Sequence, residues 1–484
     1  MMKTKTIIIA SLVALMVLSL FSCEGILDEN PPSSISLSSF YQSEDDALAG
    51  LYGAYSIIYN VSAQTYLNYG EVNADDLGIS PIVSDAYSWD FFTYNSDVTG
   101  GLWSACYNGI NRANEVVQYT DRIDFNAEKK ADIIAEAKAL RAFYYFQLVR
   151  TMGGVPLYES PTAGFDNIDA PRATADEVYD LIIGDLTAAA AELEPISPAG
   201  RINAYVADAL LARIFLYRGD YPNALMHAKR VIDSERYKLF PDYADIFKPK
   251  GNNGVEHIFQ VQYLSGEINS GVPGAFGPRQ RPGQFLKSFW ANTTVGGSWA
   301  PSADFVAENP DSYRKSVTVA DRYEHIDGVT GTVTMEEIYG GDFPYYVCKF
   351  DDREAELQSG ENFTIIRYAD ILLIAAEALN EVDPGDAQKY NWINQIRERA
   401  RNGVETDLPD LVGLSQDEFR NAVLEERRFE LAFEGQRAWD LKRRGTFLAK
   451  LSAQGKEVED FMLLFPIPDV QIELNPNLEQ NPGW

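Results

Sequence analysis

The 484-residue sequence carries 41 Lys and Arg against 71 Asp and Glu, which gives a formal net charge of −30. A surface this negative repels nucleic-acid phosphates and anionic lipid headgroups, so nucleic acid is not an expected partner. With 46% apolar and 12% aromatic residues, the chain can bury a large core, either in about three average domains or in one helical array.

The first 22 residues have the pattern of a secretory signal peptide, with two lysines before an apolar run from Ile7 to Leu18. This run is too short and too early to predict a membrane-spanning helix. Leu20 and Ser22, before Cys23, resemble a bacterial lipobox, which implies cleavage before Cys23 and acylation of that cysteine. The alternative is an ordinary cleaved signal followed by an unrelated cysteine.

Residues 23–39 are expected to form a lipid-anchored tether, because they contain Pro31-Pro32 and five serines and show no period that could pack. Two or more acyl chains hold a protein on a membrane almost permanently. The mature protein is therefore expected to be anchored to the membrane. The other two cysteines, Cys106 and Cys348, either pair or stay as thiols.

Helical spacing predicts a first helix from Glu44 to Tyr59, followed by a loop-and-strand region from Asn60 to Gly101. Helices at 102–119 and 131–152 are expected to form an antiparallel pair. The second of these helices has two apolar faces and ends at Gly153-Gly154, where glycine supplies a positive φ. Such a helix belongs in the middle of a stacked helical array.

Further helices are predicted at 176–193 and 203–217. The stretch 204–233 resembles a tetratricopeptide repeat, because a Gly219-Asp220 turn joins two helices with alanines where the helices must touch. Another helical pair is predicted at 367–380 and 386–401.

A loop-rich region from about 234 to 364 separates these last two pairs. The sequence thus predicts a fold dominated by α-helix, with tetratricopeptide-like repeats and a loop-rich ligand-binding region, in a single domain from 40 to 484.

Four blocks of the sequence resemble the signature blocks of the SusD/RagB family, in register from before residue 50 to the last residue. They are AEAKALRAFYYFQLVRTMGGVPL (135–157), RYADILLIAAEALN (367–380), ERRFELAFEGQRAWDLKRRG (426–445) and FPIPDVQIELNPNLEQNPGW (465–484). The last block is the most specific, because an irregular Pro/Asn/Gly string has no generic helical explanation.

The resemblance implies a lipoprotein of the outer membrane of a Gram-negative bacterium, facing the cell exterior. It implies a protein that binds a nutrient, usually an oligosaccharide, and lids a SusC-like TonB-dependent transporter. The helical units would face the transporter, and an irregular region would bind the ligand. The implied function is binding without a reaction. A peptide-binding receptor of the same family, a surface glycosidase and a purely structural scaffold are the alternatives.

The catalytic motifs of common enzyme classes are absent from the sequence. Its three histidines are dispersed, and no GxSxG, GxxxxGK[ST] or HExxH motif occurs. No catalytic residue, metal or cofactor is therefore expected. A glycosidase needs only two carboxylates at a suitable separation, so the 71 acidic residues leave that reaction open.

Sugar recognition needs flat apolar rings and planar polar side chains. The stretch YSWDFFTYN (87–95) offers both, and its candidate ligand-binding residues are Trp89, Phe91, Tyr94 and Asn95. Family members bind glycan with an aromatic-plus-asparagine arrangement in this part of the chain. The alternative is that half of these rings belong to the core.

A second stretch, 263–301, is a long segment rich in Gly, Pro and aromatic residues, which favours a functional loop. Its candidate ligand-binding residues are Tyr263, Phe289, Trp290 and Trp299. Arg279 and Arg281 are candidates to pair with an acidic sugar, or else lie solvated or in salt bridges.

The one local positive feature is a basic cluster in the segment from Arg427 to Arg444. The pairs Glu425/Arg428 and Arg437/Asp440 stand three residues apart. This spacing predicts an ion network within helices.

Overall fold

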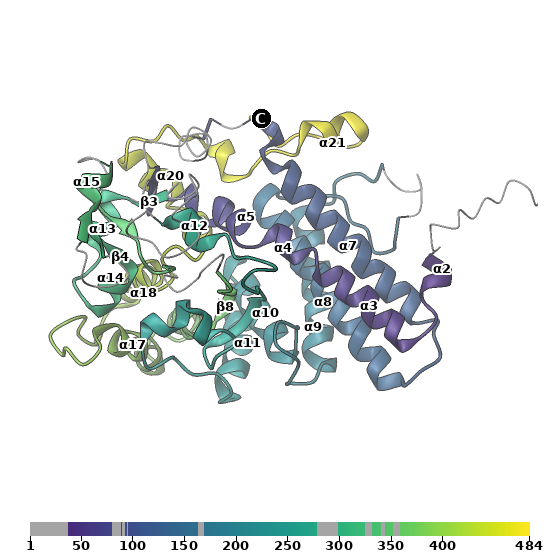
Figure 1. Ribbon diagram of the computed structural model, residues 1–484, viewed down its shortest axis with the longest axis horizontal. Helices are drawn as coiled ribbons and strands as arrows, with labels where there is room; N and C mark the ends of the chain where they lie inside the picture. The colour runs from purple at the N-terminus through teal and green to yellow at the C-terminus, as the bar shows by residue number, and fades with distance from the viewer. Residues whose placement is uncertain are drawn as a thin grey trace, which may run out of the picture.

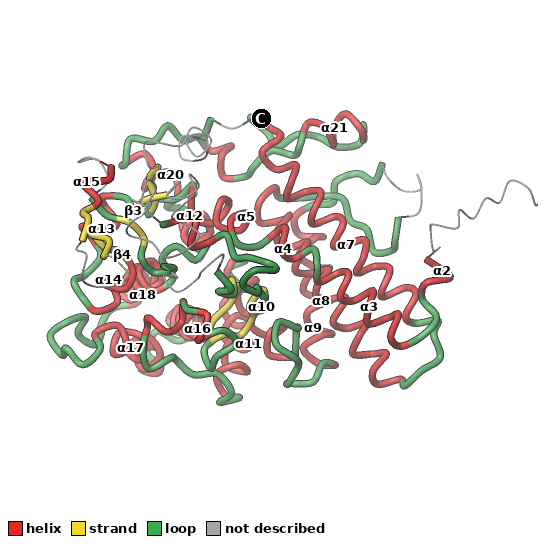
Figure 2. The backbone as a smooth tube through the Cα atoms, in the orientation of Figure 1, coloured by secondary structure: helices red, strands yellow, loops and turns green. Residues whose placement is uncertain are grey.

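The computed structural model describes residues 37–79, 89, 92–93, 95–162, 169–277, 299–324, 332–339, 344–351 and 359–484. The expected signal peptide, Cys23 and most of the tether lie outside these ranges. The described chain is mainly helical, with a few short strands (Figures 1 and 2). Among the described helices, none combines the length and the apolar character needed to cross a bilayer.

The long helices form a stacked array in which each packs on the next one along the chain (Figure 1). These helices are α3 (Glu44–Tyr55), α7 (Gly100–Thr120), α8 (Ala127–Met152), α9 (Ala175–Glu192), α10 (Ala204–Tyr217), α11 (Tyr221–Asp233), α16 (Tyr368–Val382), α17 (Gln388–Arg401) and α18 (Gln416–Glu430). This arrangement confirms the predicted helix-rich, tetratricopeptide-like fold.

Helix α8 occupies the middle of the first layers, as its two apolar faces predict. It begins four residues earlier than expected, because the side chain of Asn126 caps it by accepting a hydrogen bond from the N–H of Lys129 (2.9 Å). Every residue from 139 to 152 is buried. The helix ends at Gly153, whose φ is 76°.

The region between α3 and α7 is more helical than the sequence predicts. The first helix stops at Tyr55, and a chain of short elements follows in place of a simple loop and strand. They are α4 (Ile58–Val61), α5 (Gln64–Leu67), the π-helix η2 (Asn68–Val72), β1 (Leu77–Ile79) and the 3₁₀ turn η3 (Ser96–Thr99). A further short helix, α2 (Leu37–Phe40), precedes α3.

The predicted loop-rich region contains short helices and two-stranded antiparallel sheets. The sheets pair β1 with β3 (Trp299–Pro301), β2 (His257–Val261) with β8 (Phe363–Arg367), β4 (Val319–Ala320) with β7 (Tyr346–Val347), and β5 (Arg322–Glu324) with β6 (Thr332–Thr334). The short helical elements are η4 (Tyr243–Phe247), η5 (Pro249–Gly251), α12 (Val272–Phe276), α13 (Ala303–Glu308), α14 (Tyr313–Thr318) and α15 (Met335–Tyr339).

The chain ends in four short helical elements, α19 (Arg437–Arg443), α20 (Phe447–Ala453), η8 (Asp460–Leu463) and α21 (Asp469–Leu474).

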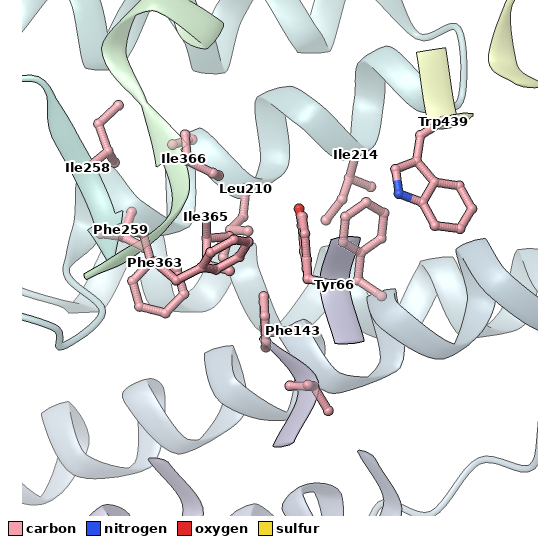
Figure 3. Close-up of a cluster of buried hydrophobic side chains, with 14 of the residues drawn as sticks. Tyr66, Phe143, Leu210, Ile214, Ile258, Phe259, Phe363, Ile365, Ile366 and Trp439 are labelled. Carbon is pink, nitrogen blue, oxygen red and sulfur yellow. The ribbon is translucent and has the colours of Figure 1, made fainter. Parts of the chain in front are cut away.

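The core joins the helical array to the sheets (Figure 3). Phe259 and Phe363, from the β2–β8 pair, lie beside Phe143 of α8 and Leu210 of α10. The rings of Phe143 and Phe259 meet edge to face, with centroids 5.9 Å apart. Burial of such aromatic pairs holds the irregular region on the helices.

The basic cluster lies in the interior, where it bonds to carboxylates from distant elements. Arg427 donates to Asp370 (2.7 Å) and to Asp440 (2.8 Å), and Arg437 donates to Asp75 (2.7 Å). The predicted pairs Glu425/Arg428 and Arg437/Asp440 are therefore wrong, but Arg443 donates to Asp440 (2.8 Å) at the predicted three-residue spacing within α19. Helices α18 and α19 are packed on several sides, so Arg427, Arg428 and Arg437 bond to carboxylates of the surrounding elements.

A second group of buried charges surrounds Glu430. Its carboxylate accepts hydrogen bonds from Arg367 (2.6 Å), Arg314 (2.9 Å) and Arg399. Burial opposes ionisation, yet Arg399, Arg367 and Arg314 together hold the pKa of Glu430 well below its usual range. The carboxylate is thus ionised inside the core.

Candidate functional site

A cleft of about 550 Å³ lies where the short helices after α3 meet the start of α7. We call it the Trp89 cleft. It is lined by Asn60, Thr65, Asn68, Tyr69, Trp89, Val98, Gly101, Leu102, Ser104, Ala105 and Asn108.

The π-helix η2 supplies Asn68 and Tyr69 to this cleft, while its Glu71 is buried and bonds to the turn that follows α18. The carboxylate of Glu71 accepts hydrogen bonds from the N–H groups of Phe433 (2.9 Å), Gly435 (2.9 Å) and Gln436 (3.2 Å). Burial, reinforced by Asp76, raises the pKa of Glu71 to about 8. π-Helical turns occur frequently at functional sites.

Gly70 allows η2 to approach the turn that follows α18. A Cβ atom at Gly70 would lie 2.1 Å from the carbonyl oxygen of Gly435. Only glycine fits such a close backbone approach. The wall of the cleft that carries Asn68 and Tyr69 is therefore fixed against the C-terminal part of the chain.

Trp89 is half-buried and is positioned by two other rings. Its centroid lies 5.1 Å from that of Tyr69, edge to face, and 6.1 Å from that of Phe465. Tyr69 and Phe465 also meet edge to face at 5.0 Å. This arrangement supports the indole from behind and leaves part of it exposed in the cleft, as stacking on a sugar ring requires.

The polar side chains of the cleft are largely free of internal partners. Those of Asn60, Thr65, Asn68 and Ser104 make no hydrogen bond to any described residue. Asn108 Oδ1 accepts a hydrogen bond from Arg112 Nε (2.9 Å), which leaves the amide Nδ2 for other use. The cleft therefore combines an aromatic surface with neutral donors and acceptors available to a ligand.

Two other cavities differ from the Trp89 cleft in this respect. In a cavity of about 420 Å³ between α7 and α21, Asn111 accepts from the N–H of Thr162 (2.8 Å) and Asn475 donates to the carbonyl of Ala170 (2.9 Å). In a cavity of about 940 Å³ beside α13, Lys315 pairs with Asp311 (2.8 Å). Asn111, Asn475 and Lys315 are thus already bonded to other groups of the protein.

The predicted site residues of the first stretch separate in the structure. Trp89 lines the cleft. Asn95 does not line it, and its exposed side chain caps η3 by accepting a hydrogen bond from the N–H of Asp97 (3.2 Å). Phe91 and Tyr94 lie outside the described residues.

The second stretch contributes no described residue to the Trp89 cleft. Tyr263 lies with its hydroxyl 3.1 Å from Ser62 Oγ and its ring edge to face with Tyr59. Trp299 is 4% exposed and belongs to the core, in β3 paired with β1. A ring this buried has no face for a ligand, which corrects the expectation for Trp299. Phe289 and Trp290 lie outside the described residues.

The polar residues of the cleft were not among the residues predicted from the sequence. Ser104 and Asn108 are four residues apart on α7, so they share one helix face. This polar pair, on the part of α7 that also carries Leu102 and Ala105, was the available signal. Asn68 gave no such signal, because a π-helix has no simple periodicity in the sequence.

Within the parts of the chain that the structure describes, no group of three or more His, Cys, Asp or Glu side chains is arranged to hold a metal ion. Cys106 and Cys348 are thiols and form no disulfide with each other. Burial raises the pKa of the Cys106 thiol, so it is inert as a nucleophile.

Comparison with known proteins gives concordant matches over most of the chain. Residues 298–484 match the family model described as the SusD family, and residues 26–216 match one described as starch-binding associating with outer membrane. SusD-like protein P2 of Formosa agariphila is 30% identical over 512 residues, covering 97% of this chain and 98% of that protein.

Solved structures agree. A laminarin-binding SusD-like protein is 26% identical with a TM-score of 0.77, covering 92% of this chain and 100% of its own. A SusD superfamily protein from Parabacteroides distasonis is 25% identical with a TM-score of 0.80, at the same coverage.

Proposed function

This chain belongs to the SusD family, and from that premise we propose that it captures an oligosaccharide in the Trp89 cleft and delivers it to a SusC-like TonB-dependent transporter. The laminarin-binding relative supports a glycan as the ligand class. The description of the second family model supports association with the outer membrane.

The observation that carries the proposal is the combination, in one cleft, of a half-buried indole with amides and hydroxyls that bond to no described residue. An indole covers the apolar C–H face of a pyranose ring, and planar amides bind pairs of sugar hydroxyls. In the two other cavities described above, Asn111, Asn475 and Lys315 are bonded to other groups of the protein.

The anchoring and the domain organisation are part of the same proposal. Cys23 would carry the acyl chains after cleavage of residues 1–22, and residues 23–39 would tether a single domain of residues 40–484 to the outer membrane, facing the cell exterior. The region from about 234 to 364 would be an insertion between the helical repeat pairs.

Binding without a reaction is supported by the lining of the cleft. Among its described residues there is no Asp or Glu, so these residues offer no carboxylate pair of the kind that glycoside hydrolysis needs. We therefore propose a binding protein that is not an enzyme. A glycan that keeps its length after long incubation with the pure protein would agree with binding without a reaction. A shortened glycan would contradict it.

The test of ligand capture is native affinity electrophoresis of the soluble Glu24–Trp484 fragment against neutral and acidic polysaccharides, with peptides tested by calorimetry. Trp89→Ala should abolish the retardation seen with the wild type, and Asn68→Ala and Asn108→Ala should weaken it. Asn391→Ala, at an exposed amide on α17, is the matched control. The proposal would be overturned if no glycan retards the protein in electrophoresis, or if calorimetry detects binding of peptides while no glycan binds.

The anchoring and the partner are tested on the full chain in its own cells. A labelled fatty acid should be incorporated into the wild-type chain and not into Cys23→Ala. A SusC-like transporter should co-purify with the tagged wild-type chain after mild detergent extraction. Equal labelling of the wild type and of Cys23→Ala would refute the lipid anchor at Cys23.

A further inference from the structure

We infer that the Trp89 cleft selects uncharged glycans and rejects sulfated or uronic-acid-rich ones. This inference rests on the proposed glycan-binding function and adds the substrate class. The described lining residues include no Lys, Arg, His, Asp or Glu. Among these described residues, the one titratable group is the hydroxyl of Tyr69, which donates to the carbonyl of Val98 (2.9 Å).

The segment that carries Trp89 adds no positive charge. Between Ser80 and Tyr94 the sequence has no Lys, Arg or His, and its charged residues are Asp85 and Asp90. This stretch of sequence therefore contains no cationic side chain that could pair with a sulfate or carboxylate bound beside Trp89.

The basic residue bonded to the lining is used to position an amide. Arg112 Nε donates to Asn108 Oδ1, and its Nη1 donates to the carbonyl of Gly53 (3.0 Å). A guanidinium has no acceptor atom, so the Asn108 atom that faces it must be the oxygen. Asn108 therefore presents its Nδ2 donor, which is suited to a neutral hydroxyl or ring oxygen.

Desolvation and the negative electrostatic potential of the whole protein both disfavour the binding of an anionic glycan. An anionic group loses hydration on entering a cleft, and without a cation there it regains little of that free energy. The formal charge of −30 adds a repulsive potential around the molecule. Asn68 Oδ1, which is buried with no partner among the described residues, is an acceptor for a hydroxyl donor.

The test compares matched pairs of glycans, each with the same backbone and differing only in charge. We name laminarin and sulfated laminarin, and amylose and carboxymethyl-amylose, measured by calorimetry with the Glu24–Trp484 fragment. The uncharged member of a pair should bind at least about tenfold more tightly, a difference well outside the error of the method.

The sign of the salt dependence gives an independent readout. Between about 0.1 M and about 1 M NaCl the Debye length falls from about 10 to about 3 Å. Affinity for the neutral glycan should stay constant, whereas any weak binding of the charged member should strengthen as repulsion is screened. A charged glycan that binds as tightly as its neutral partner, or that weakens with salt, would overturn the inference and leave the proposed function standing. If none of these four glycans and no polysaccharide of the wider panel binds, both the inference and the proposed glycan-binding function are wrong.

A gain of charge tests the same point in the other direction. Ser104→Lys places a cation on the exposed lining of α7 and should raise affinity for sulfated laminarin at about 0.1 M NaCl by about tenfold, with loss of this gain at about 1 M. Gln118→Lys adds the same charge to the same helix about 21 Å away and should change little. An equal gain in both variants would assign the discrimination to net charge and contradict selection by the cleft.

Discussion

Lys442 lies behind the ring cluster of the Trp89 cleft with its amine in apolar surroundings. Its Nζ is buried with no hydrogen-bond partner among the described residues, and lies 5.2, 4.9 and 5.0 Å from the ring centroids of Trp439, Phe447 and Phe465. Burial lowers the pKa of this amine from 10.5 to about 7. Cation–π contacts offset only part of that cost.

Replacing Lys442 with methionine should stabilise the protein more at low pH than at high pH. Between pH 7 and 10.5 the unfolded chain binds a proton that the native chain does not, so the burial penalty grows as pH falls and is complete below pH 7. We expect Lys442→Met to raise the free energy of unfolding on the order of 2 kcal/mol more at about pH 6 than at about pH 9.5.

Urea unfolding at the two pH values measures this difference. Lys238→Met, at an exposed lysine, is the control and should show no pH-dependent gain. An equal effect of Lys442→Met at both pH values would show that the amine stays protonated in the native protein.

Single aromatic residues show what a sequence can say about a site. Trp89 and Trp299 both stand in segments rich in aromatic rings, and no local pattern distinguishes a ligand-facing ring from a core ring there. The structure separates them by burial, since Trp89 is half-exposed in a cleft and Trp299 is 4% exposed in the core. Burial depends on β1 pairing with β3, a contact more than two hundred residues apart that no local pattern reports.

At the scale of elements, the π-helix η2 is the part on which the cleft most depends. Gly70→Ala would bring a Cβ atom to 2.1 Å from the backbone oxygen of Gly435, and backbone cannot move aside as a flexible side chain can. We expect a loss of stability of about 1–3 kcal/mol and a weaker affinity for glycan, because Asn68 and Tyr69 would move with η2.

Gly184→Ala is the matched control for this prediction. Gly184 lies in α9, is exposed, and a Cβ atom there would meet nothing within 4 Å. Alanine at this position should stabilise the helix by about 0.5–1 kcal/mol. Thermal unfolding of both variants measures the change in stability, and calorimetry measures the affinity for glycan. A Gly70→Ala protein with wild-type stability would show that η2 tolerates displacement.

The long helices were predictable and the short elements were not. Helix α8 carries a sustained apolar period, a capping Asn126 and a terminal Gly153, so three local signals agree. The elements α4, α5 and η2 have four or five residues each, too few to show a period. Tertiary contacts such as that of Glu71 with the turn after α18 hold them in place.

At the scale of the whole molecule, buried charges bind the helical array to the irregular region. Arg367 donates to Glu430, Glu434 and Glu256, and these contacts join β8, the end of α18 and the segment before β2. Arg367→Met would leave three buried carboxylates without this partner. We expect a loss of about 3–5 kcal/mol in the free energy of unfolding.

The control is Arg218→Met, which removes an ion pair with Asp176 that is largely exposed. Its cost should stay below about 1 kcal/mol. Added salt should reduce the contribution of Arg218 and leave that of Arg367 almost unchanged, because buried pairs are screened far less. Equal costs for the two variants in urea unfolding would contradict the structural role of Arg367.

The contact of Phe465 with Trp89 sets an order for the biogenesis of this protein. Thr99, which follows the cleft residue Val98, also donates a hydrogen bond to the carbonyl of Pro466, 367 residues later in the chain. A ribosome has almost finished translation before the second partner of these contacts exists. The early helices can condense on the nascent chain, but the backing of Trp89 forms only at completion. Ligand affinity is thus a property of the finished polypeptide, and a chain that stops before Phe465 would retain helices without a competent cleft.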